Sequence, residues 1–278
     1  MRVLLAALVL GLALAASACG GSGSSSPSVA ATTSSAPDAQ AVVQAGQKSS
    51  DAGSARASFT ASFTGAASGT MTGEGEFSKH EGHVTLDLSG LGNGTFGGGE
   101  AELVFSNLVY YVKLPENAGL PVPPGKEWFK IDLQKLGQTS GLDLDQLTQL
   151  GQSDPSQALL FLKGASDDFH EVGSEDVRGE PTTHYAGTID LQKVAETAPP
   201  DVADQYRKLA QLAPSSKVPM DVWVGEDGLV RKLRFEQKLA EGSSMTMEEE
   251  LYDYGADVDV SPPDDDEVID LTDLIAQT

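Results

Sequence analysis

Cysteine is almost absent from this chain, which has a single one among 278 residues. One cysteine excludes any disulfide within the chain, so its stability must come from a buried core. Basic residues are also scarce, because 18 Lys and Arg stand against 41 Asp and Glu, and the formal net charge is −23. A surface of that sign repels the phosphates of nucleic acids, so we expect no nucleic-acid partner.

After the first 18 residues no apolar run approaches the length needed to span a membrane. The motifs of common catalytic sites are missing too, among them G-x-S-x-G, G-x-x-x-x-G-K and H-E-x-x-H. His80 and His83 are predicted to share a turn without a cysteine partner, and His170 and His184 stand alone in strands. The acidic run at residues 264–266 lacks the spacing of a calcium loop. We therefore expect no catalysis, no metal and no cofactor.

The amino terminus is the one strongly apolar segment. A short basic start is followed by VLLAALVLGLALAASA, which is typical of a secretory signal peptide over residues 1–18. Cleavage there would make Cys19 the first residue, where it resembles the acylated cysteine of a bacterial lipobox. Ala16 occupies the position that usually holds leucine. Ordinary signal peptidase could cut the same bond and release a secreted protein with a free thiol.

The domain organisation follows from the composition. Residues 19–40 are rich in Gly and Ser and have no aromatic residue, which predicts a flexible linker behind the lipidated cysteine. A short helix is predicted at residues 41–53. We expect one domain at residues 41–262, long enough for a well-buried core, and an acidic tail at residues 263–278 with at most a short helix or strand.

Period-two alternation of apolar and polar residues dominates the body of the chain. It is clear in ASFTASFTG, GTMTGEGEFS, HVTLDLS and EAELVF, and it predicts antiparallel strands with one apolar and one wet face. Further strands are predicted in LVYYVKL, EWFKIDL, DFHEVGSEDVRG, EPTTHYAGTIDL and SSMTMEEELYDY. A hairpin is predicted in VPMDVWVGEDGLVRKLRFEQ with its turn at residues 225–228. Helical inserts are predicted at residues 153–165 and 191–213.

About ten strands with two helical inserts predict an α+β fold, a large curved antiparallel sheet (half-barrel) wrapped over the inserts. Small residues and methionines on its apolar face are features of an adaptable cavity, but the pattern alone favours a packed core, because packed cores are the rule. The residues predicted to line a cavity, if there is one, are Phe59, Phe63, Met71, Gly73, Gly75, Phe77, Leu86, Leu88, Leu103, Phe105, Leu160, Phe161, Met220, Val222, Leu233, Phe235, Met245 and Met247.

Three consecutive glutamates at residues 248–250 interrupt the alternation of the last long strand. An unbroken register would put Glu249 in line with Met245, Met247 and Leu251 on the apolar side. The alternative is a bulge that shifts the register, or a position at the end of the strand. We favour the bulge or strand end.

Five segments follow one another behind the lipobox: EFSKHEGHVTLDLS, LVYYVKLP, EWFKIDL, VRGEPTTHYAGTIDL and VPMDVWVGEDGLVRKLRFEQ. In strand order and turn placement the chain resembles the LppX/LprAFG family of actinobacterial lipoproteins over about residues 42–260. The resemblance implies a half-barrel akin to the LolA and RseB carriers, with an apolar cavity for acyl chains. It also implies a lipoprotein, anchored by Cys19 to the outer face of the cytoplasmic membrane, that carries a lipid or lipoglycan across the cell envelope.

Two other classes of function stay open. The same fold could serve as a protein-binding or sensory module of the envelope without lipid cargo, or a dispersed catalytic site could depend on the histidines. The partners we expect are the acyl chains of a lipid or lipoglycan, the membrane through the anchor, and an envelope transporter. We expect the protein to be a monomer.

Overall fold

A computed structural model describes most of the body of the chain. The signal peptide with Cys19, the predicted helix at residues 153–165 and most of the one at residues 191–213 lie outside the described residues. The described residues are 37–65, 68–78, 81–91, 98–115, 118, 122–132, 134–136, 168–190, 192, 195–196, 207, 217–238 and 242–276.

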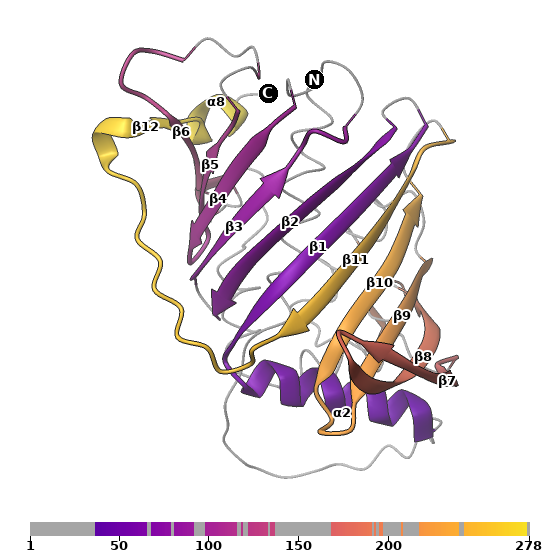
Figure 1. The fold of residues 1–278 in the computed structure, drawn as a ribbon. Helices are drawn as coiled ribbons and strands as arrows, with labels where there is room; N and C mark the ends of the chain where they lie inside the picture. The colour runs from indigo at the N-terminus through magenta and orange to yellow at the C-terminus, as the bar shows by residue number, and fades with distance from the viewer. Residues whose placement is uncertain are drawn as a thin grey trace.

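The described strands form one large, open, curved sheet (Figure 1). Their spatial order is β12-β6-β5-β4-β3-β2-β1-β11-β10-β9-β8-β7, and all neighbours are antiparallel except the parallel pair β12 and β6. The predicted fold class is therefore confirmed. The bounds are β1 Ser54–Thr64, β2 Gly69–Ser78, β3 Glu81–Asp87, β4 Glu100–Ser106, β5 Val109–Lys113, β6 Trp128–Asp132, β7 His170–Val177, β8 Glu180–Asp190, β9 Lys217–Gly225, β10 Val230–Lys238, β11 Ser244–Tyr252 and β12 Val268–Asp270, with the helices α2 Pro37–Asp51 and α8 Thr272–Ala276 and the 3-10 turn η3 Asp265–Glu267.

Apart from the edge strand β12, the sheet consists of two meanders, β1 to β6 and β7 to β11, which meet where β11 pairs with β1. That pairing runs from Arg56 opposite Tyr252 to Thr64 opposite Ser244 without a shift of register. Because β2 pairs with the other side of β1, the first strand of the chain lies near the middle of the sheet. The two meanders therefore share one continuous face.

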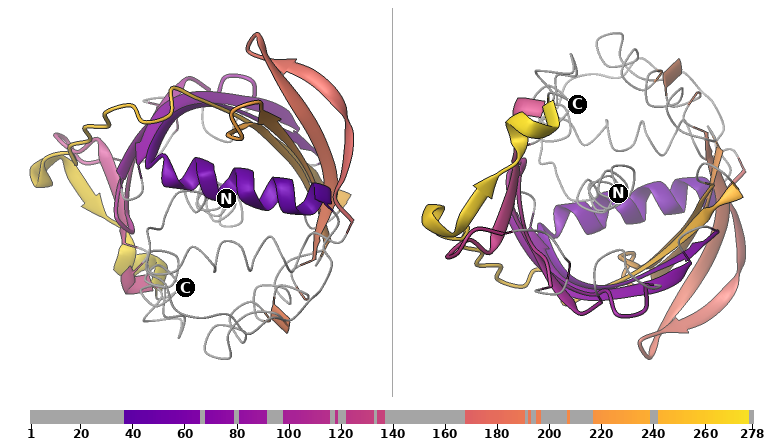
Figure 2. Two further views of the ribbon diagram at one scale, coloured as in Figure 1. Left: turned by 90° about the horizontal axis from the view of Figure 1, so that it is seen from below. Right: turned by 90° about the horizontal axis from the view of Figure 1, so that it is seen from above.

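Helix α2 lies inside the curve of the sheet, as both views of Figure 2 show. It begins at Pro37, a residue favoured in the first turn because the backbone N–H it lacks would have no partner there. Hydrogen bonds hold it at both ends. The Glu171 N–H donates to Asp38 Oδ2 over 3.1 Å, and the Val230 N–H donates to Ser49 Oγ over 2.8 Å. No helix among the described residues is long and apolar enough to cross a membrane.

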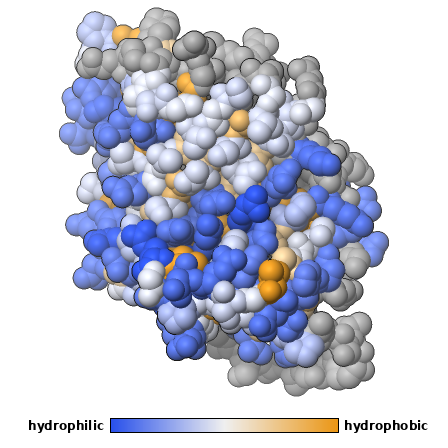
Figure 3. Space-filling model, turned by 45° about the vertical axis from the view of Figure 1, so that its right-hand side comes forward, coloured by the Kyte–Doolittle hydropathy of each residue, from blue (hydrophilic) through white to orange (hydrophobic). Residues whose placement is uncertain are grey.

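The opposite, convex face carries the polar half of the alternation. Ion pairs join neighbouring strands there, with 3.5 Å between Arg56 Nε and Glu76 Oε2 and 3.3 Å between Arg234 Nε and Glu248 Oε1. In the view of Figure 3, hydrophilic residues dominate the lower part and the sides, near-neutral residues fill the upper middle, and apolar residues are scattered among them. One wet face and one apolar face are what the alternation predicts.

The turn between β9 and β10 falls at the predicted glycines. The Gly225 N–H donates to the Leu229 carbonyl over 2.9 Å, and Gly228 has a φ of 75°. That left-handed conformation favours glycine, because a Cβ would be strained there. The predicted hairpin is confirmed.

Residues 263–276 of the predicted acidic tail are built into the sheet. They supply η3, the edge strand β12 and helix α8. The Asp132 N–H donates to Oγ1 of the buried Thr272 over 3.0 Å, and the Leu271 N–H donates to the Lys130 carbonyl over 2.9 Å. The segment therefore covers the β6 edge, which would otherwise present unpaired backbone groups.

Candidate functional site

One contiguous apolar cluster covers the concave face of the sheet, the face that curves around α2. Along β1, alternate side chains are buried, from Ala55 through Ala57 and Phe59 to Ala61. Residues of β2, β3, β4, β5, β9, β10 and β11 belong to the same cluster. The two meanders thus place a single wide apolar surface on one side of the sheet.

Most of the residues predicted to line a cavity face this way. Met245 is buried but lies outside the cluster, and Leu160, Phe161 and Cys19 lie outside the described residues. The predicted lining residues within the cluster are Phe59, Met71, Phe77, Leu86, Leu88, Leu103, Phe105, Val222 and Met247. Those that are partly buried against it are Phe63, Met220, Leu233 and Phe235. A role of these residues in holding lipid stays a prediction.

The two glycines of β2 do not leave open volume, contrary to the sequence interpretation. A Cβ added at Gly73 would lie 2.6 Å from both Leu86 Cδ2 and the Thr85 carbonyl oxygen. At Gly75 it would lie 2.3 Å from the His83 carbonyl oxygen and 2.9 Å from Val84 Cγ2. Glycine is needed here because β3 approaches β2 too closely for any side chain.

Helix α2 contributes residues to the concave cluster that the sequence analysis did not assign to it. Ala39, Val42 and Ala45 are buried and belong to the same cluster as the sheet residues. Their spacing of three residues puts them on one helix face, a signal that the sequence contains. The helix predicted at residues 41–53 starts four residues later than α2, and the sequence analysis assigned it no part in the core. It covers part of the apolar face instead.

Glu249 lies in the middle of the concave face, so the predicted bulge is wrong. Strand β11 pairs with β1 and with β10 without a shift of register at this point. The residues directly opposite Glu249 are Phe59 on β1 and Leu233 on β10. Its side chain follows Met247 and precedes Leu251 on the buried face of β11, and only 6% of Glu249 is exposed.

The registers of the neighbouring strands extend this position into a transverse row across eight strands, which we name the Glu249 row. Among these eight residues Glu249 has the only carboxyl group, and the Tyr185 hydroxyl at one end is the other polar group. On the edge strand β7, Glu171 is paired with Tyr185. From β4 to β8 the row consists of Ala101, Leu86, Gly73, Phe59, Glu249, Leu233, Val222 and Tyr185.

Burial raises the pKa of Glu249 from 4.5 to about 8. The cause is the loss of hydration, which disfavours the charged form. No hydrogen bond or ion pair joins Glu249 to another residue in the described part of the chain. At neutral pH the group is therefore mainly a neutral carboxylic acid, with one O–H donor and unused acceptor positions.

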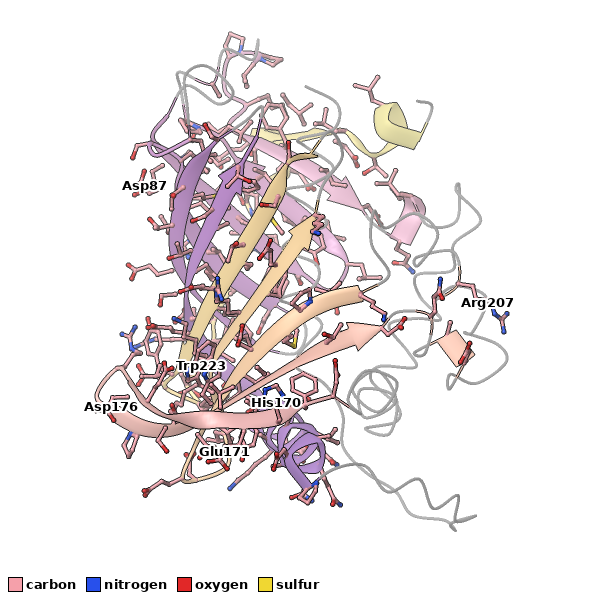
Figure 4. All side chains as sticks on the ribbon, turned by 90° about the vertical axis from the view of Figure 1, so that its right-hand side faces the viewer. Asp87, His170, Glu171, Asp176, Arg207 and Trp223 are labelled. Atoms are coloured by element: carbon pink, nitrogen blue, oxygen red, sulfur yellow. The ribbon has the colours of Figure 1, made fainter. Side chains whose placement is uncertain are left out.

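On the convex face, His184 acquires partners that the sequence did not reveal. Its ring stacks on Trp223 with centroids 4.2 Å apart, and its Nε2 lies 2.8 Å from Asp221 Oδ1. The Trp223 indole N–H donates to Glu175 Oε2 over 3.1 Å. Figure 4 shows Trp223 beside β7, at the point where this edge strand curls over the sheet. The contacts hold β7 against β8 and β9, and they give His184 a structural role.

The predicted turn around His83 is wrong, because this residue lies inside β3. Its Nε2 is 3.4 Å from Glu102 Oε2 on β4. Within the described ranges, no three His, Cys, Asp or Glu residues are grouped closely enough to hold a metal ion.

Comparison with known proteins connects this fold with a lipoprotein family. Residues 154–260 match the family model described as LppX_LprAFG lipoprotein. An uncharacterized 31.2 kDa protein in the rplA–rplJ intergenic region of Streptomyces griseus is 31% identical over 159 residues, which cover 55% of this chain and 51% of that protein. A putative lipoprotein of Streptomyces coelicolor is 27% identical over 171 residues, 60% of this chain and 50% of that protein. The match spans about half the length of these curated relatives.

Two solved structures are similar over most of this chain. The lipoprotein LppX of Mycobacterium tuberculosis has a TM-score of 0.46 and 16% identity, covering 80% of this chain and 99% of that one. LprF of Mycobacterium bovis has a TM-score of 0.41 and 13% identity, covering 83% of this chain and 99% of that one.

Proposed function

We propose that this chain, whose residues 154–260 match the LppX_LprAFG lipoprotein family model, is an exported lipoprotein that carries a lipid or lipoglycan across the cell envelope. The acyl chains would lie against the concave face between the sheet and the elements that cover it. The observation that carries this proposal is the single apolar cluster that spans both meanders on that face.

The energetics explain why such a surface is useful. Each CH₂ group transferred from an apolar phase to water costs about 0.8 kcal/mol, so a long acyl chain does not cross an aqueous compartment unaided at a useful rate. A protein that covers the chain with apolar side chains removes most of that cost. No covalent step is required, so we propose a carrier without catalytic activity.

Adaptable side chains favour a ligand that varies in shape. Met71 and Met247 lie on either side of Ala61 in the register of β2, β1 and β11. Methionine is unbranched and polarisable, and it repacks at little cost around different apolar partners. A wide surface with a small residue between two methionines suits flexible acyl chains better than it suits a single rigid ligand.

We propose that the protein is held at the outer face of the cytoplasmic membrane by acylation of Cys19. Residues 20–36, together with Cys19, would separate that anchor from α2, which begins at Pro37. A Gly/Ser-rich segment of this kind gives reach and lets the folded domain approach both a donor and an acceptor, such as an envelope transporter.

Transfer between vesicles tests the proposed function. Donor vesicles would contain a fluorescent diacyl lipid and acceptor vesicles none, and the full chain would be added without detergent. The wild-type protein is expected to raise the transfer rate in proportion to its concentration. Ala61→Trp would fill the concave face and abolish this effect, while Ser62→Trp, on the next residue and the opposite face, would not.

The fold of each variant would be checked by circular dichroism, since overpacking costs about 1–3 kcal/mol. A wild-type protein that leaves the transfer rate unchanged would contradict the proposed function. Equal transfer by folded Ala61→Trp and Ser62→Trp would contradict the assignment of the concave face.

A further inference from the structure

The three consecutive glutamates of β11 have different surroundings. Glu248 Oε2 lies 2.9 Å from Lys232 Nζ, and Glu250 Oε2 lies 3.3 Å from Arg178 Nη1, both on the convex face. Glu249, between them, points to the concave face and has no hydrogen-bond or ion-pair partner among the described residues. Of the three, the middle glutamate is therefore the one without a partner in the part of the chain that the structure describes.

Its immediate neighbours cannot satisfy a carboxyl group. The facing side chains on the adjacent strands are Phe59 and Leu233, and those before and after it on the same face of β11 are Met247 and Leu251. A buried polar group without a hydrogen bond is unfavourable, and replacing it with an apolar residue is usually stabilising or neutral. A carboxyl group at this position is explained if a bound ligand forms a hydrogen bond with it.

The chemistry of the site indicates which group of a ligand would form a hydrogen bond with Glu249. A neutral carboxylic acid offers an O–H donor, and the acceptor that every acyl-ester lipid provides is the ester carbonyl oxygen. The rest of the Glu249 row has no cationic side chain that would attract a phosphate or a carboxylate. The apolar members of the row extend over four strands on the β1 side of β11 and over two on the β10 side, roughly 19 Å and 10 Å at the usual strand spacing. A lipid with its ester linkage at Glu249 and acyl chains to both sides fits this layout.

Resting on the proposed carrier function, we propose that Glu249 is a ligand-binding residue, which donates a hydrogen bond from its carboxyl group to the ester carbonyl of a neutral acyl-ester lipid. The apolar residues around it hold the chains, and Glu249 sets where the ester linkage lies. The site thus distinguishes ester-linked lipids from ether-linked ones.

A competition experiment tests this assignment. The full chain, stripped of lipid, would be incubated with an equimolar mixture of a diacylglycerol and its dialkyl-ether analogue of equal chain length. The protein would be reisolated by gel filtration without detergent, and the two lipids would be quantified by mass spectrometry. The wild-type protein is expected to enrich the ester lipid by about three- to tenfold, the gain from one net hydrogen bond.

Three variants separate the hydrogen bond from packing. Glu249→Leu is expected to bind both lipids with a ratio near one, because it keeps the apolar surface and loses the donor. Glu249→Gln is expected to keep the preference, because its amide N–H also donates. Glu250→Leu, on the convex face, is the control and is expected to behave like wild type.

Two results would overturn the inference and leave the carrier function standing: bound lipid with a wild-type ratio near one, or an undiminished ester preference in Glu249→Leu. Displacement of the diacylglycerol by a long-chain alkylamine from wild type but not from Glu249→Gln would also overturn it, since the carboxylate would then be pairing with a cation. If wild type retains neither lipid, the proposed function fails and the inference fails with it. Should Glu249→Leu not fold, Glu249→Met, which also lacks a donor, takes its place with the same expected ratio near one.

Discussion

Replacing Glu249 with glutamine is expected to change how the stability of the protein depends on pH. Glu249 is 6% exposed, and burial raises the pKa of its carboxyl group from 4.5 to about 8. Below pH 4.5 it is protonated in both the folded and the unfolded chain and adds no pH dependence. Between pH 4.5 and about 8 it is protonated only in the folded chain, so unfolding releases a proton. The free energy of unfolding therefore falls as the pH rises through this window.

The magnitude follows from the width of the window, about 3.5 pH units between 4.5 and about 8. Each pH unit changes the free energy of unfolding by about 1.4 kcal/mol, so the full effect is on the order of 5 kcal/mol. Glutamine does not titrate and contributes none of it. The difference in stability between Glu249→Gln and wild type should thus shift in favour of the variant as the pH rises, and level off above about pH 8.

The assay is urea unfolding of the lipid-stripped protein at a series of pH values from 4 to 9, for wild type and variant. Lipid must be removed because a bound ligand adds its own stabilisation. Subtracting the two curves cancels every other titrating group. Burial raises the pKa of Tyr110 and Tyr185 above the usual value of 10, so these tyrosines titrate outside the window. Glu250→Gln, which loses an exposed ion pair with Arg178, is the control.

A constant difference between wild type and Glu249→Gln from pH 4.5 to 8 would refute the reasoning, because it would mean that the carboxyl group is hydrated or paired in the folded protein. The same pH-dependent difference in Glu250→Gln would also refute it, since the effect would not depend on burial.

Three further changes probe other parts of the molecule. Gly82→Ala would place a Cβ 2.4 Å from Phe105 Cε1, and we expect the overpacking to lower the free energy of unfolding by about 1–3 kcal/mol in urea; unchanged stability would contradict the packing described. Thr272→Val would leave the buried Asp132 N–H without an acceptor, and hydrogen exchange should show faster opening of β12 and β6 while β1 stays protected. Cys19→Ala should move the protein from the membrane to the soluble fraction and remove the acyl mass from its amino terminus, whereas continued membrane association would contradict the anchor.

Much of the sheet could be predicted from local pattern. Alternation of apolar and polar residues along β1 and β2 identified both the strands and the face that each side chain takes, because period two is a property of the strand itself. Glycines at the turn between β9 and β10 marked the hairpin for the same local reason.

Other features depend on contacts between residues far apart in the chain, and the local pattern does not contain them. The pairing of Arg56 with Tyr252 joins the first long strand to the last and makes β1 central. Parallel pairing of Val268 with Trp128 draws the acidic tail into the sheet. Neither alternation nor turn residues specify which strands become neighbours.

The glycines of β2 and the glutamate of β11 show where reasoning from residue type fails. Gly73 suggested empty volume, but Leu86 and the backbone of β3 fill the space beside it. Glu249 suggested a bulge, because a carboxyl group is rarely buried without a partner. The alternation of Met245, Met247 and Leu251 predicts the observed position, because Glu249 lies on the same buried face of β11 as these residues.

Lipid analysis of the purified protein tests the central claim, that the concave face holds acyl chains. The full chain and the matched pair Ala61→Trp and Ser62→Trp would be purified without detergent from an actinobacterial host, extracted with organic solvent and analysed by mass spectrometry. We expect near-stoichiometric diacyl or triacyl lipid with wild type and Ser62→Trp, and loss of that lipid from folded Ala61→Trp. A wild-type protein that carries no lipid, and takes up none when lipid is added, would mean that the concave face is a packed core and would contradict the account.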